Sequence, residues 1–179
     1  MRILKKILVV AGAIVALLLI VALFVKKDYL VEREIVINKP KAEVFEYIRF
    51  IKNQDHFSQW NQLDPNMKKT YKGTDGTVGF VSAWESTHEN VGVGEQELVK
   101  IADGERIDMK LRFKTPFEAE NDAYMTTEDL GNNQTKTKWG FKGAFPYPMN
   151  LMGLVIDMED AVGGDLEVGL KNLKTVLEK

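Results

Sequence analysis

The pattern of hydrophobic positions begins with one continuous apolar run near the N-terminus. The 19 residues from Ile7 to Val25 include no charged or polar side chain. A helix rises about 1.5 Å per residue, so a run of this length matches the roughly 30 Å core of a bilayer. Lys5 and Lys6 precede the run and Lys26 follows it, and lysine side chains can extend to the two membrane interfaces. The pattern predicts a single transmembrane helix.

A cleaved signal peptide and a buried helix of a soluble protein are the alternatives to a membrane anchor. The run is longer than the roughly 7–15 apolar residues of a signal peptide, and its end lacks a small-x-small cleavage site. Three basic residues precede the run and two follow it, a slight excess that favours a cytoplasmic N-terminus. We therefore expect a single-pass membrane protein, with an anchor over residues 1–27 and a domain over residues 28–179 outside the cytoplasm.

After the anchor, hydrophobic and polar residues alternate with a period of two in several segments. Residues 29–37 show this alternation, which is typical of a half-buried strand. It is clearest from Ile107 to Phe113, where Met109 belongs to the inward face and Lys110 to the outward face. Short turns between consecutive strands imply antiparallel neighbours. Further strands are predicted at residues 67–72, 78–86, 92–101, 119–128 and 135–141.

Helical spacing is found before and after these strands. It predicts a helix over residues 41–51, a second short helix over residues 54–63 and a long amphipathic stripe from Met149 to Leu177. Gly163 and Gly164 interrupt the stripe, which predicts a kinked helix or two helices end to end. The apolar face of the sheet needs a partner, and the terminal helix is the only large one. The order of elements predicts an α+β fold, in which a curved antiparallel sheet of about seven strands grips the C-terminal helix.

The distribution of charge and of reactive residues narrows the function. Residues 1–27 carry five basic and no acidic side chains, whereas the remainder carries 19 basic and 26 acidic ones, a net of −7. Such an acidic part is a poor candidate for binding nucleic acid. The lack of cysteine excludes disulfides, thiolate zinc sites and cysteine nucleophiles. Only two histidines, His56 and His88, are present, so we expect no metal site and no cofactor.

Several short motifs resemble the START-like SRPBCC superfamily, the polyketide cyclase/dehydrase and lipid-transport group. Residues 35–40, 44–45 and 57–60 resemble its opening, although Gln59 replaces a usual proline. Membrane-anchored bacterial members are similar over the whole chain, at residues 64–67, 78–79, 82–85, 93–94, Phe113, Pro116, Phe117, 135–139, 148–153 and 169–173. These motifs are structural and not catalytic. The resemblance implies a helix-grip fold with a hydrophobic cavity between the sheet and the terminal helix, which holds lipids, polyketides or similar molecules.

Aromatic and aliphatic side chains are therefore the candidates for lining a cavity. Methionine suits such a site because it is flexible and polarisable, and the polar atoms of tryptophan and tyrosine can orient a ligand. For each residue the alternative is an ordinary packed core. The candidates are Trp60, Tyr71, Phe80, Trp84, Met109, Phe113, Tyr124, Trp139, Met149, Met152 and Ile156.

No residue stands out as catalytic. His88 lies near carboxylates, but its segment is typical of a polar turn, and His56 is expected at the surface or at a cavity rim. The acids Asp157, Glu159 and Asp160 of the terminal helix fit a solvated face.

We expect a membrane-tethered binding or carrier protein for a hydrophobic small molecule or lipid. The alternatives are an enzyme of the polyketide cyclase/dehydrase or hydrolase kind, and a protein-binding, chaperone-like module. The sequence makes no prediction of oligomeric state.

Overall fold

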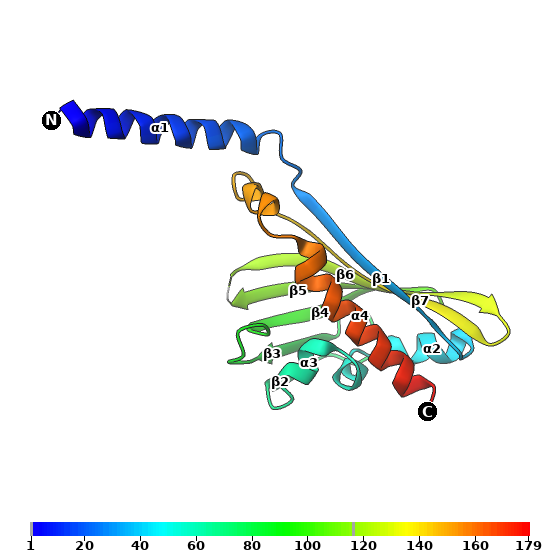
Figure 1. Ribbon diagram of the computed structural model, residues 1–179. Helices are drawn as coiled ribbons and strands as arrows, with labels where there is room; N and C mark the ends of the chain where they lie inside the picture. Colours follow the sequence, from blue (N-terminus) through cyan, green and yellow to red (C-terminus); the bar gives the residue numbers. More distant parts are fainter. Residues whose placement is uncertain (1, 116) are drawn as a thin grey trace.

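The apolar N-terminal run forms helix α1 (Arg2–Ala22), which projects away from the rest of the molecule (Figure 1). The structure is a computed structural model that describes residues 2–115 and 117–179; Pro116, one of the residues that carries the family resemblance, lies outside them. α1 starts before the apolar run and ends three residues before Val25, where the N–H groups of Leu23 and Phe24 close tighter turns on Ile20 and Val21. By its length and composition, α1 could cross a membrane.

The alternating segments form one antiparallel sheet of seven strands, as predicted. Its order is β1-β7-β6-β5-β4-β3-β2, so the last six strands pair in chain order and β1 lies beside the last of them. The predicted inward and outward faces of β5 are confirmed, because Met109 is buried and Lys110 points to the opposite face. The strands are β1 (Asp28–Ile37), β2 (Lys68–Lys72), β3 (Val81–Glu85), β4 (Val93–Ala102), β5 (Arg106–Thr115), β6 (Ala119–Gly131) and β7 (Gln134–Ala144).

Three short helical elements connect β1 to β2. They are α2 (Lys41–Ile48), the 3-10 helix η1 (Ile51–His56) and α3 (Gln59–Leu63). The predicted helix over residues 54–63 is thus divided into η1 and α3, because Ser58 adopts an extended conformation between them. The predicted helix over residues 41–51 ends early for a related reason. Phe50 is extended, and the carboxylate of Asp75 accepts hydrogen bonds from the next two backbone N–H groups at 2.9 and 3.2 Å.

The C-terminal stripe forms the 3-10 helix η2 (Met149–Leu154) and helix α4 (Met158–Leu177). Of the two alternatives predicted at Gly163 and Gly164, two helices end to end is wrong, because α4 continues through both glycines as one helix. The break lies before α4, where the side chain of Asp157 caps the helix by accepting from the N–H of Glu159 at 2.8 Å. Gly163 instead serves packing, since a Cβ there would overlap the guanidinium of Arg33 on β1.

The hydrophobic core lies between α4 and the concave face of the sheet. Figure 1 shows α4 lying across this face. Residues from both layers are almost fully buried, and burial of this kind contributes about 1.5–3 kcal/mol for each large aliphatic side chain. The buried side chains include Val31, Ile37, Leu98, Ile107, Met109 and Met125 of the sheet and Leu166, Leu170 and Leu173 of α4.

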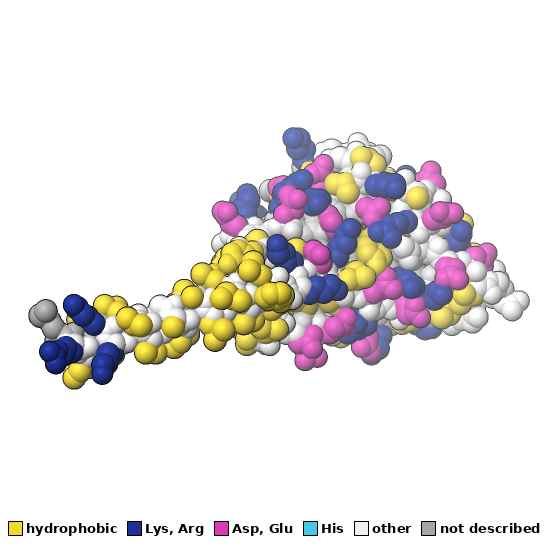
Figure 2. Space-filling view, turned by 90° about the horizontal axis from the view of Figure 1, so that it is seen from above, with side chains coloured by type: hydrophobic (Ala, Val, Ile, Leu, Met, Phe, Trp, Pro, Cys, Tyr) yellow, Lys and Arg dark blue, Asp and Glu magenta, His cyan; other side chains and the backbone are white. Residues whose placement is uncertain are grey.

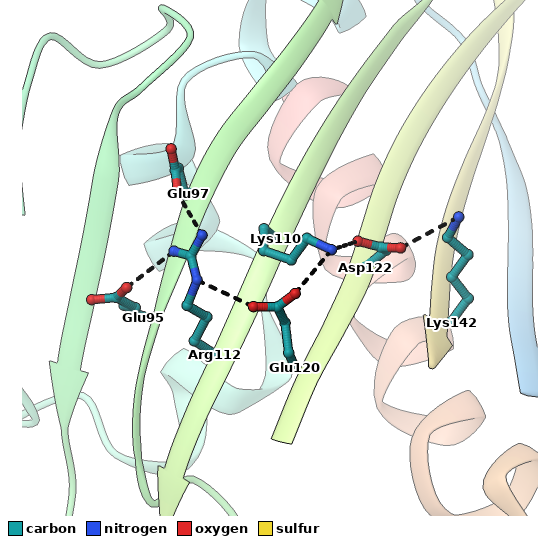
Figure 3. Close-up of polar contacts among 7 residues, drawn as sticks. All are labelled: Glu95, Glu97, Lys110, Arg112, Glu120, Asp122 and Lys142. Atoms are coloured by element: carbon teal, nitrogen blue, oxygen red, sulfur yellow. Dashed lines mark hydrogen bonds and ion pairs between the residues drawn. The ribbon is translucent and has the colours of Figure 1, made fainter. Parts of the chain in front are cut away.

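The opposite, convex face of the sheet is covered by charged side chains. Cross-strand ion pairs run over β4, β5, β6 and β7, including Arg112 with Glu97 at 2.8 Å and Lys110 with Asp122 at 2.5 Å (Figure 3). Exposed pairs of this kind contribute about 0–1 kcal/mol each, so their main effect is to keep this face hydrated. The network consists of Glu95, Glu97, Lys110, Arg112, Glu120, Asp122 and Lys142.

Candidate ligand cavity

An apolar cavity of about 170 Å³ lies between the concave face of the sheet, α3 and the N-terminal half of α4. The strands contribute its floor, and Val162 and Leu166 of α4 close one side. Asn61 of α3 and the exposed Asn90 of the β3–β4 loop stand at its rim. The apolar wall consists mainly of Trp60, Trp84, Trp139, Phe113, Phe141, Met109 and Leu111.

The cavity contains five of the residues that the sequence singled out. Trp60, Trp84, Met109, Phe113 and Trp139 all line it, and they come from α3, β3, β5 and β7. The five include all three tryptophans of the chain.

The other six predicted residues lie elsewhere. Tyr71 and Phe80 stack on each other with ring centroids 6.0 Å apart, Phe80 being buried in the core. Tyr124 lies on the convex face because its neighbours on β6, Ala123 and Met125, take the inward positions. The remaining three belong to η2 and the turn after it; they are Met149, Met152 and Ile156.

Edge-to-face contacts hold the aromatic wall in place. The ring of Trp139 lies 5.6 Å from that of Phe57 and 6.0 Å from that of Trp60, with interplanar angles of 70° and 81°. Gly169 of α4 permits this arrangement, since a Cβ at this position would come within 2.7 Å of Trp139. On the other side, the indole N–H of Trp84 donates to the carbonyl of Val91 at 3.3 Å. The shape of the cavity is therefore set by interlocked side chains.

Two glutamines add a polar point to this apolar wall. The amide of Gln96 on β4 donates to the side-chain oxygen of Gln54 on η1 at 2.9 Å. Among the described residues, the amide nitrogen of Gln54 donates only to the sulfur of Met109, at 3.5 Å, and a thioether is a weak acceptor. Gln54 is 5% exposed, so its side-chain amide is buried in the wall and its N–H groups can still donate a hydrogen bond to a ligand.

Sequence reasoning missed both glutamines. The alternation of β4 could have identified Gln96. It lies between Glu95 and Glu97, which face outward, so its own side chain faces inward. The position of Gln54 follows from contacts across 42 and 55 residues of chain, which no local pattern encodes.

Among the described residues that line the cavity, none has a side chain that titrates as an acid or base. His56 is exposed and bonds to the hydroxyl of Tyr47 at 2.8 Å, while His88 lies in the β3–β4 turn. Both positions agree with the interpretation from sequence. Glu159 pairs with Arg33 outside the cavity.

An ionisable side chain with a strongly raised pKa, that of Tyr124, lies on the convex face. The hydroxyl of Tyr124 donates to the carboxylate of Glu32, and the guanidinium of Arg106 stacks 4.0 Å from the ring centroid. Burial and the adjacent carboxylate raise the pKa of Tyr124 to about 12. The hydrogen bonds from Tyr124 and Lys138 lower the pKa of Glu32. These side chains link β1, β5, β6 and β7 on the face of the sheet opposite the cavity.

The cavity lies toward the end of the sheet that is nearest to α1. This end of the sheet is the one at which β1 begins. The strand pairing shows which residues of the neighbouring strands lie at the same end: Asp28 of β1, Ala144 of β7, Ala119 of β6, Thr115 of β5, Val93 of β4 and Glu85 of β3. We call it the anchor-side edge. Trp84, Phe113 and Phe141 are within a few residues of it and line the cavity.

Known proteins support the fold and identify the family. The sequence model for polyketide cyclase/dehydrase and lipid transport matches residues 29–178. No curated protein matches the chain.

Solved structures with this fold come from plants and bacteria. Norcoclaurine synthase from Thalictrum flavum in complex with dopamine and hydroxybenzaldehyde is similar with a TM-score of 0.62 and 10% identity, covering 89% of this chain and 91% of that chain. XoxI from Bacillus cereus has a TM-score of 0.58 and 15% identity, with 84% and 96% covered. A protein from Thermobifida fusca has a TM-score of 0.56 and 18% identity, with 83% and 92% covered. At such low identities the likeness shows the fold alone.

The matched residues begin within β1 and end just beyond α4, so they include the entire sheet, the terminal helix and the cavity between them. This match agrees with the resemblance carried by the sequence motifs. The chain belongs to the polyketide cyclase/dehydrase and lipid transport family.

Proposed function

We propose that this protein is a membrane-tethered binding or carrier protein for a hydrophobic small molecule or part of a lipid. In this proposal, residues 1–27 form the anchor and residues 28–179 form the ligand-binding domain outside the cytoplasm. The observation that carries the proposal is the apolar cavity between the sheet and α4, at the anchor-side edge. An apolar ligand partitions into a bilayer, so a tethered binding site meets it at a raised local concentration.

The volume of the cavity limits the size of the ligand. A cavity of about 170 Å³ resembles in size the apolar cavity of roughly 150 Å³ that binds benzene in another protein. Sites for drug-sized molecules measure about 300–1,000 Å³. We therefore infer that one ring or a short alkyl segment fits as the side chains stand, and that a longer ligand requires the half-buried Trp60 and Val162 to move.

The two glutamines favour a ligand with one polar group. A carbonyl or hydroxyl oxygen placed beside Gln54 can accept from its amide, which otherwise faces a sulfur atom. The rest of the ligand contacts aromatic and aliphatic side chains. The proposed ligand is thus apolar with a single hydrogen-bonding group.

The described lining favours binding over catalysis. General acid–base catalysis needs a side chain such as His, Asp, Glu or Lys near the reacting atoms, and the described lining includes none of these. The described lining does include the hydroxyl of Ser58, but a serine nucleophile is activated by an adjacent base, and no such base is among these residues. One structural relative is a synthase by name, but at 10% identity this likeness carries no activity over to the present chain.

The test is to identify what the full-length protein retains when it is purified in a mild detergent. We expect mass spectrometry of an organic extract to detect one class of apolar molecule bound to the wild-type protein. Val162→Phe, which fills the cavity from α4, should lose it, whereas Val168→Phe, on an exposed position of the same helix, should retain it. Equal amounts in the two variants would contradict the proposal, because binding would then lie outside the cavity.

A further inference from the structure

The most exposed hydrophobic side chains beyond α1 gather at the anchor-side edge. Among the described residues after Ala22, the three most exposed large ones are Val155 at 88%, Phe24 at 84% and Phe117 at 75%. Phe24 follows α1, Val155 follows η2, and Phe117 lies in the turn between β5 and β6. Figure 2 shows hydrophobic side chains along α1 and around the place where it joins the rest of the molecule. The convex face, by contrast, is covered by ion pairs (Figure 3).

One continuous segment contributes most of this exposed apolar surface. Residues 145–156, which we call the η2 segment, contain no charged side chain, although 28% of the chain is charged. Within it, Met149 is 51% and Leu154 is 63% exposed. Such exposure of neighbouring apolar residues marks an interaction site.

The η2 segment is fixed to the last turn of α1 by hydrogen bonds. The side-chain amide of Asn150 is fully buried and donates to the carbonyls of Ala22 and Val25 at 2.7 and 2.9 Å. The hydroxyl of Tyr147 donates to the carbonyl of Leu19 at 3.4 Å. Asn150 therefore satisfies carbonyls that the end of a helix leaves free, and it holds η2 at the level of that end.

We propose that the η2 segment lies in the interface of the bilayer that α1 crosses. This inference rests on the proposed membrane anchor. If α1 spans the hydrocarbon core, its last turn reaches the headgroup region, and the attached segment comes to the same depth. Tyrosine is typical of this region, and Lys26 and Lys27 at the same level suit anionic headgroups.

The location of the segment has a consequence for the proposed cavity. Insertion of η2 turns the anchor-side edge, which carries the cavity, toward the membrane surface. A ligand leaving the bilayer would then meet the rim of the cavity without crossing bulk water. In this way α1 holds the domain at the membrane, and the η2 segment orients the domain so that its cavity faces the membrane surface.

The lack of cysteine in the chain permits a direct test by single labels. Val155→Cys in the η2 segment is compared with Val78→Cys, an exposed valine at the opposite end of the sheet, and with Val15→Cys within α1. Each full-length variant carries an environment-sensitive fluorophore and is reconstituted into vesicles of phosphatidylcholine and phosphatidylglycerol. Nitroxide groups on the lipid headgroups or on the acyl chains then quench any label within the bilayer.

We expect a blue shift and quenching at Val155, with headgroup nitroxides the more effective, and quenching by acyl-chain nitroxides at Val15. The label at Val78 should stay unquenched. Quenching at Val15 without quenching at Val155 would overturn the inference and leave the anchor intact. No quenching at Val15 would overturn the anchor and this inference together.

A second variant distinguishes the membrane from a protein partner. Leu154→Asp in the Val155→Cys background should reduce the quenching at Val155, because the new charge disfavours the interface, and Val99→Asp on an exposed position of β4 should not. A label at Val155 that is shielded only as the protein concentration rises would identify a second copy of the chain as the partner and overturn the proposal.

Discussion

At the scale of single residues, Gln54 gives the cavity its polarity. Within residues 2–115 and 117–179, its amide nitrogen has the sulfur of Met109 as its only hydrogen-bond partner, so a ligand oxygen can gain a hydrogen bond that a hydrocarbon cannot. We predict that Gln54→Leu lowers the affinity for acetophenone by about 1 kcal/mol, roughly fivefold, and leaves the affinity for ethylbenzene unchanged or higher. Gln62→Leu, on an exposed position of α3, is the control. Calorimetric titration measures both, and a parallel loss for the two ligands would contradict a polar contact.

The ionisation of Tyr124 makes the free energy of unfolding decrease as the pH rises into the alkaline range. Its pKa is about 12 in the folded protein, against about 10 in an unfolded chain, so the unfolded state ionises first as the pH rises. The stability from this group is complete below about pH 10 and is lost as the pH approaches 12. We predict that the melting temperature of Tyr124→Phe falls less between about pH 9 and pH 11 than that of the wild-type protein. The other tyrosines contribute equally to both proteins, and an identical fall in the two would show that Tyr124 ionises normally.

At the scale of elements, the glycines of α4 have different roles. Gly164 is exposed, and a Cβ there would meet no atom within 4 Å, so Gly164→Ala should stabilise the protein by about 1 kcal/mol. Gly169→Ala should destabilise it, because the new Cβ would come within 2.7 Å of Trp139. Denaturant melts of the two full-length variants measure the difference. A stabilising effect of the second substitution would mean that Trp139 does not pack against α4 as described.

The strand β5 offers a similar comparison across its two faces. Met109 is 1% exposed, and Met109→Lys places an unpaired charge in the core, which should cost several kcal/mol. Lys110 pairs with Asp122 and Glu120 on the hydrated face, and Lys110→Met should cost about 1 kcal/mol or less. Equal losses in the melting curves of the two variants would contradict this assignment of the inward and outward faces of β5.

These elements show which parts of the fold the sequence could predict. Strands such as β5 are buried on one face and hydrated on the other, so their period of two identifies both the strand and its faces. The break between η2 and α4 was missed, because Met149, Met152 and Ile156 continue the helical spacing of α4 while η2 binds to α1 through Asn150. A contact between segments 128 residues apart leaves no mark on local periodicity.

The candidate cavity was predictable to a similar extent. All three tryptophans lie in the wall of the cavity, since large aromatic side chains on inward positions line either a core or a cavity. Tyr124 was misplaced because it was chosen by residue type. Its neighbours Ala123 and Met125 face the core, so the alternation along β6 places Tyr124 on the convex face. Gln54 depends on how η1 packs against β4 and β5, which only the assembled structure reveals.

At the scale of the whole molecule, the proposal requires one orientation in the membrane. We predict that the N-terminus is cytoplasmic and that residues 28–179 lie on the other side, following the slight excess of basic residues before α1. Alkaline phosphatase fused after Lys179 should be active in a bacterial host, and green fluorescent protein fused there should not fluoresce. The opposite result would reverse the orientation, and a mature N-terminus near Lys26 would remove the anchor.

The central claim is that the space between the sheet and α4 binds an apolar ligand, and the tryptophans of the chain test it directly. All three line the cavity, so their fluorescence reports on its contents. Bromobenzene, a heavy-atom quencher close in size to the cavity, is titrated into the full-length protein in nanodiscs. We predict saturable quenching that an excess of benzene reverses. Quenching that rises linearly with bromobenzene and is insensitive to benzene would contradict the account, because it would reflect random collisions and not a binding site.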